Sequence, residues 1–158
     1  MTTPSLRDTV AFLRAAYAGA SVGGTPRWVR SLQVMRLLPE VLPGIKVTHA
    51  DRQVALLRDV LETTTTTEGA MLWAGFPEPV VDGVVRLSRF DAGCPYLDHM
   101  RAVAASRDLS AMRAAMAGLM HEERLGSAPR GRGAVEALAE TPERRRQAMA
   151  ILARGLGC

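Results

Sequence analysis

A ten-residue apolar stretch that also carries charges, residues 54–63, constrains this chain more than any other feature. Its apolar side chains recur at spacings of three and four and cover most of a helical circumference: Val54, Ala55, Leu56, Leu57, Val60 and Leu61. This periodicity predicts a buried helix. The apolar surface is interrupted by Arg58, Asp59 and Glu62.

A helix this apolar is expected at the centre of its domain, so its charges must reach a rim, a partner or a ligand. Arg58 and Glu62 are four residues apart and share one helical face, while Asp59 lies three residues before Glu62 on an adjoining face. The simplest interpretation is an intrahelical ion pair at the edge of the core. The alternative is that these charges belong to a site.

The rest of the chain fits one helical domain. A length of 158 residues is enough for a single domain with a real core. Hydrophobic residues make up 47% of the chain but aromatic residues only 4%, so we expect an aliphatic core. The net charge of +4 is too small to indicate nucleic-acid binding. The basic segments at Arg130/Arg132 and 144–146 are separated and lack interleaved aromatics, which argues against it further.

The cysteine spacing, the first residues and the length of the apolar runs predict a cytoplasmic protein. Cys94 and Cys158 have neither metal-site nor disulfide-framework spacing, which is typical of a reducing environment. The first residues lack the basic-then-apolar pattern of a signal peptide, and no apolar run is long enough to cross a bilayer. We therefore expect no membrane association.

Periodicity, caps and turn residues predict an all-α single domain, residues 1–158, of seven to eight helices. Expected helices cover about 5–18 (starting near Thr3 or Ser5), 27–38, 48–63 (starting between Thr48 and Asp51), 68–74 (with Thr67 as its cap), 80–87, 96–105, 109–123 and 142–154, with a basic loop at 126–133 and a further turn or two at 134–139. The valine-rich stretch 80–87 also fits a buried strand, but no second strand is available to pair with it. In the last helix, Thr141 is the expected cap and the run Arg144–Arg146 is expected to face water.

Three stretches, in order, carry a resemblance to a known family. The first is Ala16–Gly19 followed by Gly23-Gly24-Thr25-Pro26-Arg27-Trp28-Val29-Arg30; the second is Val54–Thr64 followed by Gly75-Phe76-Pro77 and residues 80–89; the third is Pro95-Tyr96 and the helix around Arg113 and Met116. Together they resemble the HD-domain phosphohydrolases, specifically the RelA/SpoT-type domain that removes pyrophosphate from guanosine tetraphosphate. The resemblance covers about residues 5–125 and implies an HD-type helical bundle.

The resemblance also implies a metal site, because two histidines and two aspartates hold a divalent cation, normally manganese, in that family. A bound cation makes a water nucleophilic and neutralises charge on the leaving phosphate. The ligand positions fall on Arg30, Arg58, Asp59 and, on or near, Met116. In the family a glutamate follows the His-Asp pair, and its position falls on Glu62. The helix that carries the last metal-binding aspartate also carries a lysine, whose position falls on Arg113.

Only Asp59 keeps a metal-binding side chain among those positions. A guanidinium carries a permanent positive charge and has no acceptor, and methionine sulfur is too soft for manganese. His49, His99 and His121 fall outside the motif and are expected to be ordinary surface or structural histidines. We therefore expect no cofactor, with Asp59 and Glu62 as remnants of a lost catalytic site.

The leading hypothesis is a pseudoenzyme that binds a nucleotide or phosphate, or that acts in regulation. Arg30 and Arg58 are the main phosphate-binding candidates, with Arg27 and Arg113 as auxiliaries. Its ligand would be a guanine nucleotide alarmone or another phosphorylated small molecule, and a protein partner or a homo-oligomer is also compatible. One alternative is an active phosphohydrolase with rearranged ligands. Another is a structural or protein-interaction module in which the arginines pair only with Asp59 and Glu62.

Overall fold

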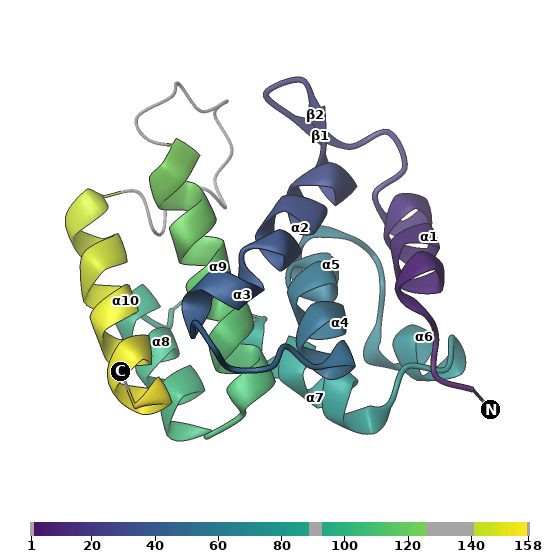
Figure 1. The fold of residues 1–158 in the computed structure, drawn as a ribbon. Coiled ribbons are helices and arrows are strands. Elements are labelled where there is room, and N and C mark those ends of the chain that lie inside the picture. The colour runs from purple at the N-terminus through teal and green to yellow at the C-terminus, as the bar shows by residue number, and fades with distance from the viewer. Residues whose placement is uncertain (1, 89–92, 126–140, 158) are drawn as a thin grey trace.

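A computed structural model describes residues 2–88, 93–125 and 141–157. The described chain is predominantly helical, as expected, with one short hairpin (Figure 1). Its elements are α1 (Leu6–Ala16), β1 (Ser21–Val22), β2 (Thr25–Pro26), α2 (Arg27–Arg36), α3 (Leu38–Val41), α4 (His49–Leu57), α5 (Val60–Thr63), α6 (Glu68–Trp73), α7 (Glu78–Leu87), α8 (Tyr96–Ala105), α9 (Leu109–Leu125) and α10 (Pro142–Leu156). The expected loop at 126–133, the turns at 134–139 and Cys158 lie outside the described residues.

Hydroxyl side chains begin several helices where the sequence predicted them. Ser5 and Thr48 each form a capping box, with Asp8 and Asp51 respectively, so that side chain and backbone satisfy each other at the first turn. Thr67 caps α6 and Thr141 caps α10, with Pro142 following as the first residue of the helix. The helical interpretation of residues 80–87 is confirmed by α7.

Two expected helices are divided in the structure. The helix expected over residues 27–38 ends at Arg36, and a separate short helix, α3, follows with Pro39 in its first turn. The helix expected over residues 48–63 was wrong as a single element, because it breaks at Arg58 and Asp59 into α4 and α5. At the break Asp59 adopts φ −104° and ψ 0°, outside helical geometry.

A two-residue hairpin occupies the loop before α2. β1 and β2 pair antiparallel, with Val22 opposite Thr25. Gly23 and Gly24 make the turn at φ 57° and 82°, the left-handed conformation that a tight two-residue hairpin needs and that glycine adopts without strain. The hairpin ends directly at Arg27 and therefore fixes where α2 begins.

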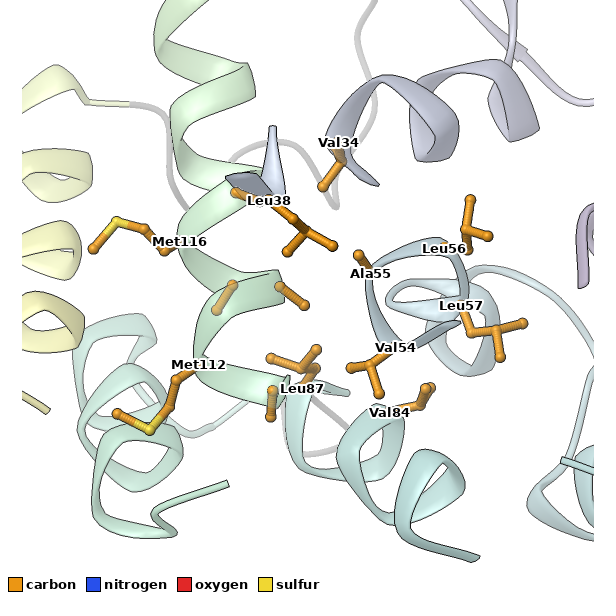
Figure 2. Packing of buried hydrophobic residues seen from close by; sticks show 14 of the residues in the cluster. Val34, Leu38, Val54, Ala55, Leu56, Leu57, Val84, Leu87, Met112 and Met116 are labelled. Atoms are coloured by element: carbon orange, nitrogen blue, oxygen red, sulfur yellow. The ribbon is translucent and has the colours of Figure 1, made fainter. Parts of the chain in front are cut away.

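The core is one cluster centred on α4 and α9. Helix α4 packs against α9, α2, α1 and α7, while α9 also packs against α10 and α8 on its other side (Figure 1). Figure 2 shows Val54 of α4 beside Val84 and Leu87 of α7 and Ala55 on the side of Val34 and Leu38, whereas Leu57 points away from α9. All four apolar residues that end α4 are at most 1% exposed: Val54, Ala55, Leu56 and Leu57. The opening prediction of a buried central helix is confirmed for this part.

Helix α10 corrects one expectation about charge. Arg144 and Arg146 face water, but Arg145 is only 6% exposed. Arg145 is buried because it shares the inward stripe of α10 with Ala148 and Leu152, at spacings of three and four. Within the described residues, no helix has both the length and the apolar character needed to cross a membrane.

Candidate functional site

A cavity of about 230 Å³ opens where α2, the α4–α5 junction, α8 and α9 meet. Its polar lining comes from every one of these elements: Arg27, Arg30, Ser31, Arg58, Asp59, Glu62, Thr63, Tyr96, His99, His121 and Glu122. Ala55, Leu119 and Met100 form part of its apolar wall. The structure therefore brings Arg27 and Arg30 of α2 to the same cavity as Arg58 and Asp59 of the α4–α5 junction and Glu62 of α5.

Arg58 occupies the junction between α4 and α5 and is held there by its neighbour. Its Nη2 donates to Asp59 Oδ2 over 3.0 Å, and the Arg58 side chain is 22% exposed. Burial by itself lowers the pKa of the Arg58 guanidinium, but the charges of Asp59 and Glu122 outweigh burial, so its pKa is raised above the ordinary value. Arg58 is therefore a fixed cation with its own carboxylate partner.

Gly118 of α9 makes the space that the Arg58 guanidinium fills. A Cβ atom at residue 118 would overlap Arg58 Nη1 and lie 2.6 Å from Arg58 Cζ. Glycine inside a helix costs about 1 kcal/mol relative to alanine. The guanidinium thus lies against the backbone of α9 and links the α4–α5 junction to that helix.

Arg30 lines the same cavity in different surroundings. It is half-buried on α2, and among the described residues its guanidinium makes no hydrogen bond or ion pair. Its positive charge is nevertheless felt across the cavity, because it contributes to lowering the pKa of His121 on α9. Arg30 is therefore available to an anionic ligand.

Arg27 is the first residue of α2 and contacts an aromatic ring. Its Cζ is 5.8 Å from the ring centroid of Tyr17. The Tyr17 hydroxyl hydrogen-bonds to Thr63 Oγ1 over 2.9 Å, which ties α1 to the end of α5. Burial first, and then the charge of Asp59, raise the pKa of Tyr17. Tyr17 therefore stays neutral and positions Arg27 at the edge of the cavity.

Two candidates from the sequence lie elsewhere. Arg113 does not line the cavity; its Nη1 donates to Asp51 Oδ2 over 2.8 Å, and Asp51 is only 1% exposed. Met116 is a core residue, and in Figure 2 its side chain points away from α4. Neither of these α9 residues lines the cavity, and the reason is geometric. The cavity is lined by the α9 positions Ala115, Leu119 and Glu122, which lie on a different stripe of that helix.

Sequence reasoning missed the contributions of α8 and the end of α9. Tyr96, His99, His121 and Glu122 all line the cavity. His99 donates to the Leu87 carbonyl over 3.0 Å and so links α8 to the end of α7. His49 binds the Pro4 carbonyl at the same distance and so links the start of α4 to the segment before α1. The spacing of 115, 119 and 122 was the available signal, since it marks one face of α9.

The residues present do not fit the manganese site that the resemblance implied. Among the described residues, no group of three or more His, Cys, Asp or Glu side chains is placed to hold a metal ion. Asp59, the retained ligand position, already accepts from Arg58. A guanidinium at that distance competes for the carboxylate that a cation would need.

No family model matches this chain. A search of curated proteins also found no match. The interpretation of the cavity therefore depends on its own geometry and chemistry.

Proposed function

We propose that this chain is an HD-type, RelA/SpoT-like binding domain that holds a phosphate-bearing ligand in the cavity and does not hydrolyse it. The observation that carries this proposal is the contrast between its two central arginines. Arg58 is paired with Asp59 and packed on Gly118, whereas Arg30 lines the cavity with no partner among the described residues. A guanidinium with its donors available is a strong binder of phosphate.

The chemistry of the cavity favours binding over hydrolysis. Hydrolysis in this family depends on a cation that polarises phosphate and activates water. The resemblance assigns one ligand position of that cation to Arg58, a fixed cation that cannot bind and activate a water as a metal does. The carboxylates of Asp59 and Glu62 also line the cavity, and carboxylate oxygens can accept hydrogen bonds from the N–H groups of a ligand such as a guanine base.

The size of the cavity limits how much ligand it encloses. Pockets for drug-sized ligands are typically about 300–1,000 Å³, and this one is about 230 Å³. It would therefore take a small phosphorylated molecule whole or one end of a nucleotide. Guanosine polyphosphates and other phosphorylated metabolites are the proposed ligand class.

Isothermal titration calorimetry with guanosine tetraphosphate and with pyrophosphate tests the proposal. Arg30→Ala should weaken binding by about 10–100-fold, because a charge-assisted hydrogen bond is worth about 1.5–3 kcal/mol. Arg36→Ala is the matched control, since Arg36 is exposed on the same helix, has the same charge and does not line the cavity. It should leave binding within about twofold of the wild type.

Hydrolysis is measured on the same samples. The proposal expects no release of pyrophosphate from guanosine tetraphosphate with or without manganese. Manganese-dependent release that is lost in Asp59→Ala would contradict it and support the active phosphohydrolase with rearranged ligands.

A structural or protein-interaction module is the second candidate, favoured by the packing of Arg58 between Asp59 and Gly118. In that case the cluster replaces the metal only as a link between helices. Calorimetry without heat for any guanine or adenine nucleotide would support this candidate over ligand binding.

A further inference from the structure

His121 faces the cavity from α9, while Arg30 faces it from α2. The imidazole is half-buried, and its Nε2 lies 3.1 Å from Gln33 Oε1, also on α2. Arg30 and His121 are therefore two nitrogen-bearing groups on different helices that reach the same cavity. A tetrahedral anion between them would be held from two sides.

The hydrogen bond to Gln33 determines what His121 can offer. An amide oxygen only accepts, so the Nε2 atom carries the proton. In the neutral ring, Nδ1 then has a lone pair, and no described residue donates to it. A lone pair repels an anion, whereas the protonated ring has an N–H at both nitrogens. Binding an anion through Nδ1 therefore requires the imidazolium.

The surrounding charges make this protonation depend on the ligand. Burial, followed by the positive charges of Arg30 on α2 and Arg58 at the α4–α5 junction, lowers the pKa of His121. The charge of Arg58 is offset by Asp59, and the carboxylates of Glu62 on α5 and Glu122 on α9 line the same cavity. Farther along α9, Arg124 is paired with Glu40 of α3. An anion bound beside Arg30 would offset the charge of that arginine and so raise the pKa of His121.

Building on the proposed function, we propose that His121 binds the ligand's phosphate together with Arg30, as the imidazolium. The cavity would then prefer dianionic groups, such as terminal phosphates, and binding would take up a proton. Two cations match the charge of a phosphate monoester dianion, whereas a phosphodiester has one negative charge.

Sulfate is the probe, because it is a tetrahedral dianion that does not titrate near neutral pH. Proton NMR follows the ring protons of the three histidines against pH, with and without saturating sulfate. The His121 signal is the one that disappears in His121→Gln. Without sulfate it should titrate below 6.5, and sulfate should raise its midpoint by about one pH unit, equivalent to about tenfold tighter binding to the protonated form. His49 is the internal control, because it binds the Pro4 carbonyl and does not line the cavity.

Affinity for sulfate gives an independent readout. His121→Gln should weaken sulfate binding by roughly three- to eightfold at pH 6, where only part of the wild-type ring is protonated without sulfate, and have little effect at pH 8.5, where the ring is neutral. If that variant does not fold, the assigned titration of the wild-type ring answers the same question. Arg30-dependent sulfate binding with no shift of His121 overturns this inference and leaves the proposed function intact. Absence of Arg30-dependent binding of sulfate, pyrophosphate and guanosine tetraphosphate overturns both.

Discussion

Arg58 and Gly118 depend on each other at the scale of single residues. The glycine leaves room for a guanidinium that a Cβ atom would displace. The displaced group is the far end of a flexible side chain, so the helix itself can accept alanine. Replacing Gly118 by alanine should therefore weaken the ion pair between Arg58 and Asp59 and leave the backbone of α9 undisturbed.

A double-mutant cycle measures this dependence. In an Arg58→Ala background, Gly118→Ala should stabilise the fold by about 0.5–1 kcal/mol, the ordinary preference of a helix for alanine. In the wild type the same change should give no such gain, because it moves the guanidinium from its position beside Asp59. Urea unfolding of the four proteins gives the coupling energy, expected at about 1 kcal/mol or more. Equal effects in the two backgrounds would contradict the proposed packing.

A second residue-scale prediction concerns the buried carboxylate Asp51. Burial by itself raises its pKa, but hydrogen bonds from the Ser110 hydroxyl, the Thr48 backbone and Arg113 outweigh burial, so the pKa lies below its ordinary value of 3.8. Arg113→Ala should cost about 3 kcal/mol or more at pH 7, because it leaves a buried charge without its partner. It should not change binding of guanosine tetraphosphate.

The pH dependence of this effect has a definite sign. Because the folded-state pKa of Asp51 is lowered, its interactions stabilise the fold fully above about pH 4 and lose that contribution as pH falls through the folded-state value. The stability difference between wild type and Arg113→Ala, from urea unfolding, should therefore shrink below pH 4. Arg86→Ala, which breaks the more exposed pair with Asp108, is the control and should cost at most about 1 kcal/mol.

At the scale of elements, α7 approaches α4 closely through Gly83. A Cβ atom at residue 83 would lie 3.1 Å from Val54 Cγ2, and Val54 is fully buried and stiff. Gly69 on α6 has only an ordinary contact, 3.8 Å to Thr67 Oγ1. Close packing of α4 on α7 therefore depends on Gly83 and not on Gly69.

The pair Gly83→Ala and Gly69→Ala tests this packing. Both changes favour helix, but only Gly83→Ala should overpack the core, at a cost of about 1–3 kcal/mol. We expect Gly69→Ala to be neutral or slightly stabilising in thermal unfolding and Gly83→Ala to be destabilising. A stabilising Gly83→Ala would show that α7 can move away from α4 without penalty.

At the scale of the whole molecule, the described helices share one core around α4 and α9. A single core predicts one cooperative unfolding transition. Far-ultraviolet circular dichroism and tryptophan fluorescence should give the same urea midpoint. Trp73→Phe isolates the half-buried Trp28, since Trp73 is 87% exposed and reports little on the core. Separate midpoints for the two signals would contradict a single core.

Local signals in the sequence determined where helices begin and that residues 54–57 are buried. Caps such as Ser5, Thr48 and Thr141 act within three residues, and a period of three and four needs no tertiary partner to be recognised. The helical state of residues 80–87 followed from the same local physics. The prediction that Arg30 and Arg58 lie beside Asp59 and Glu62 came instead from the ordered resemblance to the HD-domain phosphohydrolases.

Only the tertiary structure decided which arginine is paired and which faces the cavity. Arg58 and Arg30 have the same side chain, but their roles differ because Gly118 and Asp59 surround one and not the other. The break at Asp59 and the stripe of α9 that reaches the cavity likewise depend on how helices pack. Arg113 pairs with Asp51 and His121 lines the cavity because of the way α9 is rotated about its axis. A small change in that rotation would change the partners of every side chain on the helix.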